Sequence, residues 1–151
     1  MENSFYTNLY LDLQKRINNK VPKIQWIEQD FGQDVYKEWR PAVAFPAVLI
    51  DFPDSNFEAM STLHQFARVT ISLRLLDAPF TQSYADAPIE TKKDALAFFD
   101  LEHEIVVALH GWTPGYCQPL IRERATSNNQ NNIGLRIREI SFTTAYEEYF
   151  D

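Results

Sequence analysis

Apolar residues in the segment 91–111 recur at steps of three and four, which places them on one face of a helix. They are Ala95, Phe98, Phe99, Ile105, Val106 and Leu109. The opposite face carries Lys92, Lys93, Asp100, His103 and Glu104. We expect Thr91 to cap the first turn, with Asp94 three positions on, and Gly111 to end the last turn. The pattern predicts an amphipathic helix that packs on a sheet.

A second helix is predicted near the N-terminus, over residues 4–18. Its apolar residues follow a step of four: Phe5, Leu9, Leu13 and Ile17. Ser4 is expected to cap its first turn because a serine hydroxyl accepts a hydrogen bond from the free amides there. Pro22 disfavours helix at the residue before it, so the helix is expected to end by that point.

The strand with the clearest alternation is predicted over residues 66–76. Its apolar positions are Val69, Ile71, Leu73 and Leu75, and they alternate with Arg68, Thr70, Ser72 and Arg74. Because successive side chains of a strand point to opposite faces, we expect one face of this strand to be core and the other to be wet.

Three further strands are predicted, over residues 23–29, 43–51 and 133–143. The second contains Pro46, which predicts either an edge strand or a bulge because proline cannot donate to a sheet ladder. In the third, the apolar alternation shifts by one position at Glu139, which favours a β-bulge there.

Two connections are predicted to lack regular structure. The sequence of residues 53–62 predicts a loop that crosses between strands. Residues 113–132 have poor periodicity and end in an Asn-rich run at 128–132. Long loops of this kind tend to be functional, so we expect 113–132 to be mobile and to become ordered on a partner.

Together these elements predict a single domain over residues 1–151 of the α+β class. Its sheet is expected to be four-stranded and largely antiparallel or mixed, with the two main helices on one face. A chain of 151 residues can bury a core without a disulfide or a metal.

The composition excludes several classes of protein. A net charge of −7 argues against specific nucleic-acid binding, which relies on clustered Lys and Arg. The single cysteine, Cys117, excludes an internal disulfide and suits a reducing compartment. No apolar run approaches the length of about 18 residues typical of a membrane span. We therefore expect a cytoplasmic protein that binds no membrane.

Candidate catalytic chemistry is sparse, and we expect no cofactor and no catalytic residue. Asp100, His103 and Glu104 lie along one helical face, with His110 two turns beyond, so a metal site there is an alternative to an ordinary solvated face. Cys117 is a second alternative, as a nucleophile, although no family signature surrounds it. Three acids, Asp51, Asp54 and Glu58, are expected to serve capping and turns.

Aromatic residues are abundant, at 14% of the chain, and several fall in predicted loops. Tyr and Trp are enriched where an apolar surface meets water or a partner. The arginines nearest to a cluster are expected to face solvent or a partner's carboxylates. The candidate interaction residues are therefore Trp39, Tyr84, Tyr116, Arg122, Arg124, Arg136 and Arg138.

The order of these elements resembles that of the tail terminator, or tail completion, proteins of phages and prophages. The resemblance covers nearly the whole chain, but it lies in layout and in short phrases such as FPAVLIDF (45–52) and ALHGW (108–112). It carries no catalytic signature.

This resemblance implies a structural subunit that is not an enzyme. Such subunits form a ring, usually a hexamer, that caps the tail tube and joins it to the head. The implied partners are therefore copies of the same chain, the tail tube and head-joining proteins. The implied location is the cytoplasm during assembly and then the virion tail. The alternatives are a small metal- or cysteine-dependent enzyme and an unrelated cytoplasmic adaptor.

Overall fold

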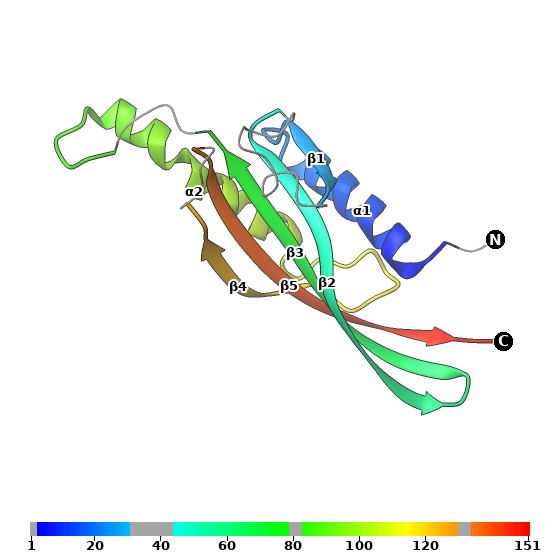
Figure 1. Ribbon diagram of the computed structural model, residues 1–151. Coiled ribbons are helices and arrows are strands. Elements are labelled where there is room, and N and C mark those ends of the chain that lie inside the picture. The colour runs from blue at the N-terminus through cyan, green and yellow to red at the C-terminus, as the bar shows by residue number, and fades with distance from the viewer. Residues whose placement is uncertain (1–2, 31–43, 79–82, 130–133) are drawn as a thin grey trace.

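The computed structural model describes residues 3–30, 44–78, 83–129 and 134–151. The elements in these ranges are α1 (Phe5–Lys20), β1 (Trp26–Gln29), β2 (Ala47–Ser61), β3 (His64–Asp77), α2 (Ile89–Leu109), β4 (Ile121–Ser127) and β5 (Arg136–Tyr149). The strands form one sheet in the order β1-β2-β3-β5-β4 (Figure 1). β1 is parallel to β2, and every other neighbouring pair is antiparallel.

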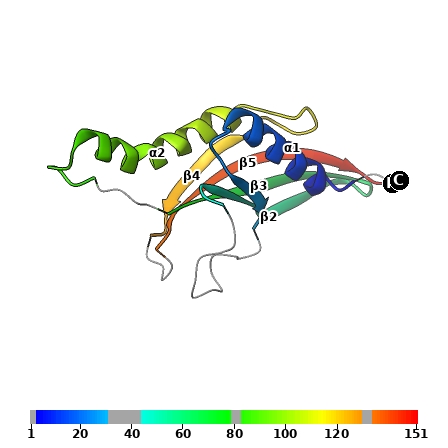
Figure 2. The same cartoon turned by 90° about the horizontal axis from the view of Figure 1, so that it is seen from above.

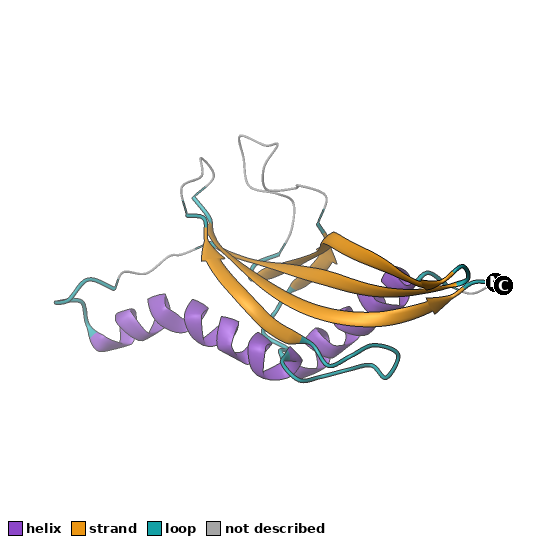
Figure 3. Cartoon of the chain, turned by 90° about the horizontal axis from the view of Figure 1, so that it is seen from below, coloured by secondary structure: helices purple, strands orange, loops and turns teal. Residues whose placement is uncertain are grey.

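Both helices lie on the same face of the sheet (Figures 2 and 3). The predicted α+β class is therefore confirmed, and the sheet is mixed. The prediction of four strands is wrong, because β4 lies inside the tract 113–132 that was expected to lack regular structure. Its sequence, IRERATS, shows little apolar alternation, since nearly all of its side chains are exposed at the edge of the sheet.

The first helix agrees with the prediction. The Ser4 hydroxyl accepts a hydrogen bond from the Tyr6 amide at 3.0 Å, which is the expected cap. Leu9, Leu13 and Ile17 are completely buried against the sheet.

The second helix begins two residues earlier than predicted. Pro88 is its N-cap residue, and no side chain caps the first turn, so the predicted cap by Thr91 and Asp94 is wrong. The reason is that the Lys92 amide already bonds to the Pro88 carbonyl at 3.0 Å, which closes the first turn before Thr91 could cap it. The predicted end is confirmed: Gly111 follows the helix with a φ of 81°, a conformation that glycine adopts without strain.

The main core lies between the helices and the sheet. Phe98, Val106 and Leu109 of α2 belong to the same buried cluster as Ile71, Leu73 and Leu75 of β3, as predicted. Phe99 is the exception, because its side chain is 54% exposed. Adjacent helical residues point about 100° apart, so Phe98 and Phe99 cannot both face the sheet. Val69 packs instead in a separate cluster with Tyr146, near the N-terminus of α1.

The face of the sheet opposite the helices is also buried at one end, so the prediction of a wet second face for 66–76 is wrong there. This second buried cluster contains Ala47, Leu49, Leu76, Ala78, Leu135 and Ile137. Arg74 lies on this face as well, with its guanidinium 3.7 Å from the Asp30 carboxylate.

Burial on two faces explains the shift in alternation at Glu139. β5 pairs with β3 in unbroken register from Arg136 to Tyr149, so the predicted bulge at Glu139 is wrong. Ile137 belongs to one face and Ile140 to the other. An irregularity does occur beside β5, but it lies on β4, between Arg122 and Arg124.

The second strand differs most from the prediction. β2 begins directly after Pro46, so this proline does not interrupt it, and it continues to Ser61, through most of the segment 53–62 where a loop was predicted. Pro53 is accommodated at a register shift between Asp51 and Asp54, on a part of β2 that β1 does not reach. β2 and β3 therefore form a long hairpin.

The outer part of this hairpin and the end of β5 project beyond the helices (Figures 1 and 3). We call this three-stranded extension the arm, and define it as residues 54–68 together with 144–150. At the opposite end of the molecule, the first turns of α2 extend past the sheet (Figure 1).

Candidate interaction surfaces

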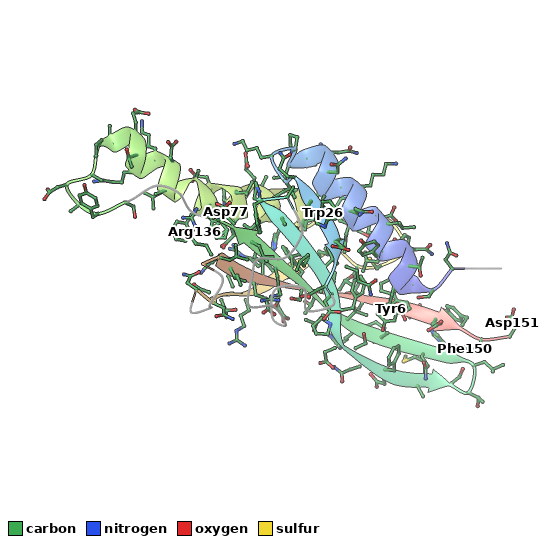
Figure 4. All side chains as sticks on the ribbon, turned by 45° about the horizontal axis from the view of Figure 1, so that its top comes forward. Tyr6, Trp26, Asp77, Arg136, Phe150 and Asp151 are labelled. Atoms are coloured by element: carbon green, nitrogen blue, oxygen red, sulfur yellow. The ribbon has the colours of Figure 1, made fainter. Side chains whose placement is uncertain are left out.

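The arm carries large apolar side chains that the described parts of the chain leave exposed. The exposed fractions are 48% for Phe57, 57% for Met60, 52% for Leu63, 67% for Tyr149 and 44% for Phe150. Phe150 lies at the far end of β5, next to the C-terminal Asp151 (Figure 4). Exposed apolar residues are individually common, but a group of them on one projecting element is typical of an interaction site.

Aromatic packing anchors the base of the arm to α1. The ring of Phe5 stacks on the ring of Tyr146, with centroids 3.7 Å apart and planes 9° apart. Tyr6 packs against Phe52 of β2 at 5.3 Å, and its hydroxyl donates a hydrogen bond of 2.6 Å to the Ser55 hydroxyl. Tyr6 belongs to the first turn of α1, and its side chain reaches β2 (Figure 4). The arm is therefore fixed at its base and free of helix contacts further out.

The hydroxyl group of Tyr146, at the base of the arm, is uncharged at neutral pH. Burial, and to a smaller degree the neighbouring Glu148 carboxylate, raise the pKa of Tyr146 to about 12. The phenol therefore stays protonated well into the alkaline range, which suits its place beside an apolar ring.

The arm is strongly acidic. It contains the carboxylates of Asp54, Glu58, Glu147 and Glu148, with Asp151 directly after it, against one arginine, Arg68. Arg68 lies over the ring of Phe66 at 5.3 Å. A partner that covers the arm therefore has to supply positive charge as well as apolar surface.

Of the predicted interaction residues, Arg122 and Arg124 lie on an exposed edge. Every residue of β4 except Thr126 is exposed. Among the described residues, neither arginine has an ion-pair partner on this chain. The Arg122 amide donates a 3.1 Å hydrogen bond to Nδ1 of His110, which holds this end of β4 beside α2. The two guanidinium groups are therefore available to a partner.

Arg136 and Arg138 have a different setting, because both are bound to carboxylates of this chain. Arg136 donates a 3.0 Å hydrogen bond to Asp77 and another to the Ala95 carbonyl, and its guanidinium lies over the ring of Phe98 (Figure 4). Arg138 donates from two nitrogens to the two oxygens of Glu102, which raises the arginine's pKa. These arginines fasten α2 to β5 and do not lie ready for a partner's carboxylates.

The three aromatic residues predicted to make interactions differ in their surroundings. Tyr116 is 41% exposed, and its hydroxyl donates a 2.6 Å hydrogen bond to Asp12, so it joins the loop after α2 to α1. Burial and the hydrogen bond to Asp12 raise the pKa of Tyr116. Tyr84 is 58% exposed. Trp39 lies outside the described residues.

The outer face of α2 presents a second apolar surface. Four of its side chains are exposed by 41–66%: Ile89, Leu96, Phe99 and Val107. They share the outer face with His103, which was predicted there. The sequence analysis identified neither this surface nor the apolar residues of the arm.

The alternative chemistry gains no geometric support from the described residues. In those parts of the chain, no group of three or more His, Cys, Asp or Glu side chains is placed to hold a metal ion. His110 Nδ1 already accepts the bond from Arg122. Burial raises the pKa of the half-buried Cys117 thiol, although hydrogen bonds with Thr144 and Thr113 act in the opposite direction. Neither described helix has the length and apolar content needed to cross a membrane.

Comparison with known proteins gives only distant likenesses of fold. No family profile matches the chain, and no curated protein matches it by sequence. Among solved structures, a similar chain comes from the virion of a native gene transfer agent particle, with 15% identity and a TM-score of 0.45. The match covers 94% of this chain and 90% of that chain. At this level, the likeness carries no argument about function.

Proposed function

We propose that the protein is a structural subunit of a phage or prophage tail, not an enzyme, and that it acts through contacts with its own copies and with other tail components. The observation that carries this proposal is the arm. It extends the sheet beyond the core and exposes apolar side chains that no described part of the chain covers. A surface of this kind serves assembly better than catalysis, because it offers no enclosed, converging set of polar groups.

The resemblance to tail terminators supports a more specific role. The subunits would form a closed ring, usually of six, that caps the tail tube and provides the joint to the head. The chain would then act in the cytoplasm during assembly and afterwards in the virion tail. Its net charge of −7 suits a ring through which DNA passes, because an acidic wall does not retain nucleic acid.

The test combines mass measurement with imaging. Light scattering at rising protein concentration is expected to show an average mass that increases reversibly above that of the monomer. Negative-stain images of the protein mixed with purified tail tubes are expected to show rings at the tube ends. The variant Phe57→Ser with Met60→Ser should lose both behaviours, whereas the control Val107→Ser removes an exposed apolar residue from α2 and should keep them.

Two results would contradict the proposal. One is a stable two-fold dimer that ignores tubes, since a dimer uses one self-complementary patch and leaves no open face. The other is stoichiometric zinc or manganese in the purified protein, which would favour the enzyme alternative.

A further inference from the structure

The arm leaves one edge of the sheet open. β1 pairs with β2 only from Ala47 to Ile50. Beyond the register shift that ends at Asp54, no strand of the described chain pairs with the outer edge of β2, so the backbone groups of residues 54–60 on that side have no ladder partner. An exposed edge of this kind is a template for another strand.

A second open edge lies at the other side of the sheet. β4 is the last strand in the order β1-β2-β3-β5-β4. The Arg122 amide at its start is bonded to His110, and beyond Arg122 no strand of the described chain pairs with its outer edge. The outer edge of β5 within the arm is different, because the Gln118 amide donates to the Ala145 carbonyl at 2.9 Å and the Thr144 hydroxyl donates to the Gln118 carbonyl at 2.6 Å. That edge is already partly occupied.

Charge decides which of the open edges fit together. The open segment of β2 carries Asp54 and Glu58, both exposed, whereas β4 carries Arg122 and Arg124 against a single acid, Glu123. Pairing β2 with a second β2 would bring carboxylates together, and pairing β4 with a second β4 would bring guanidinium groups together. Like charges on adjacent strands are destabilising and opposite charges stabilise the pair, so β2 fits β4.

The facing of the side chains agrees with this match. Glu58 pairs with Phe66 and Asp54 pairs with Thr70, which alternate with the helix-facing Val69 and Ile71. Both carboxylates therefore point away from the helices. Arg124 is opposite Ser141 of β5, which alternates with the helix-facing Phe142, so Arg124 points away from the helices as well. In a sheet that continues from one copy to the next, Arg124 and the two carboxylates lie on one face.

We propose that residues 54–60 of one copy add as a strand to the β4 edge of the next copy, with Arg124 beside Asp54 and Glu58. This inference rests on the proposed self-association and names the surfaces that carry it. β2 and β4 lie toward opposite edges of the same sheet, so the contact is head-to-tail. Each copy keeps one free edge of each kind, and contacts of this kind close into a ring when the rotation from one copy to the next divides the circle.

Cysteine cross-linking tests the contact directly. In a Cys117→Ser background, which removes the chain's only cysteine, Glu58→Cys is combined with Arg124→Cys. Mild oxidation is expected to give a ladder of dimers and larger species on non-reducing gels. The matched control combines Glu58→Cys with Lys20→Cys, an exposed position at the end of α1, and should stay monomeric. The single variant Glu58→Cys should also give no dimer, because a head-to-tail contact never brings identical positions together.

A charge exchange gives an independent measurement. Arg124→Glu should weaken self-association by about tenfold, and Glu58→Arg should do the same, because each places like charges across the contact. The variant with both substitutions should recover most of the association. Circular dichroism of each variant checks that the monomer is folded, so that weaker association reports the surface.

The outcomes separate this inference from the proposed function. A missing ladder, an equally strong ladder in the control pair, or a double charge variant that associates no better than the single ones would overturn the β2–β4 contact. If rings still form on tail tubes in that case, the proposed function stands. A specific ladder without any binding to tubes would support the contact and contradict the tail role.

Discussion

The two ends of the sheet are built from the same three strands but in different ways. At the helix-covered end, β2, β3 and β5 bury Ile50, Leu73 and Ile140 almost completely, and part of the opposite face is buried too. In the arm, the same strands bury little beyond Ala67, Thr144, Ala145 and Tyr146, and all four lie near its base.

This difference shows that strand pairing extends further along the molecule than the buried core does. The β3–β5 ladder runs without a break from the core into the arm, so backbone hydrogen bonds continue where side-chain burial stops. Hydrophobic burial supplies most of the free energy of folding, and a sheet ladder alone contributes little. The helix-covered end therefore stabilises the fold, and the arm leaves its apolar side chains exposed in the described chain.

The largest contrast is expected from truncating buried residues at the helix-covered end. Leu73→Ala and Leu109→Ala each remove a completely buried side chain and should lower the free energy of unfolding by about 2–5 kcal/mol. Phe57→Ala, the matched change in the arm, should alter it by about 0.5 kcal/mol or less. Urea denaturation of the monomer measures all three. Equal effects at the two ends would remove the distinction between core and arm.

The pair of Arg138 and Glu102 provides the next test, because it joins α2 to the covered end of β5. Its side chains are 22% and 13% exposed, so Arg138→Met leaves a largely buried carboxylate without its partner. We expect a loss of about 1–3 kcal/mol in the free energy of unfolding. Lys23→Met breaks the pair with Glu104, whose side chains are 72% and 42% exposed, and should cost less than about 1 kcal/mol. A larger loss for Lys23→Met than for Arg138→Met would count against this ranking.

The stack of Phe5 on Tyr146 should give a smaller effect, because it lies at the boundary between the two ends. A double-mutant cycle with Phe5→Leu and Tyr146→Leu is expected to give a coupling free energy of about 0.5–1.5 kcal/mol. Hydrogen exchange of Phe5→Leu should show faster exchange in the arm and unchanged protection at residues 71–75. Uniformly faster exchange over the whole sheet would mean that the arm and the core unfold as one unit.

The smallest effect concerns alkaline pH. The pKa of Tyr146 is raised from 10.0 to about 12 in the folded protein, so its contribution to stability is complete below pH 10. It is lost as the pH rises toward 12, because the unfolded chain releases this proton first. Phenolate absorbance should show Tyr146 ionising at higher pH than an ordinary tyrosine, and Tyr146→Phe should remove one late-ionising group. An unchanged titration curve in Tyr146→Phe would contradict the raised pKa.

Most of the helix-covered end was predictable from sequence, because burial on one face leaves a period that can be read directly. The two helices and the alternation of Ile71, Leu73 and Leu75 follow this rule. The edges and the arm were not predictable in this way. The turn between β2 and β3 at residues 62–63 is Thr-Leu, without the Asn-Gly or Gly-containing pairs that mark tight hairpins.

The candidate interaction residues also differ in how far the sequence alone could identify them. Exposed positions such as Tyr84, Arg122 and Arg124 were identified from composition and position alone. Arg136 and Arg138 could not be told apart from these, because their partners are distant in sequence. Asp77 comes beside Arg136 when β3 pairs with β5, and Glu102 comes beside Arg138 when α2 packs on β5. The arm's apolar residues were missed because a predicted loop gave no reason to group Phe57, Met60 and Leu63.

The sequence by itself therefore determined the α+β class, the two helices with their approximate limits, and the core face of β3, since each depends on neighbours three or four residues apart, or on strict alternation. Only the tertiary structure decided that β4 joins the sheet, that β2 continues into the arm, and which charged groups remain unpaired. These depend on backbone hydrogen bonds between segments far apart in the chain, such as β4 with β5, and such bonds impose no period on either segment.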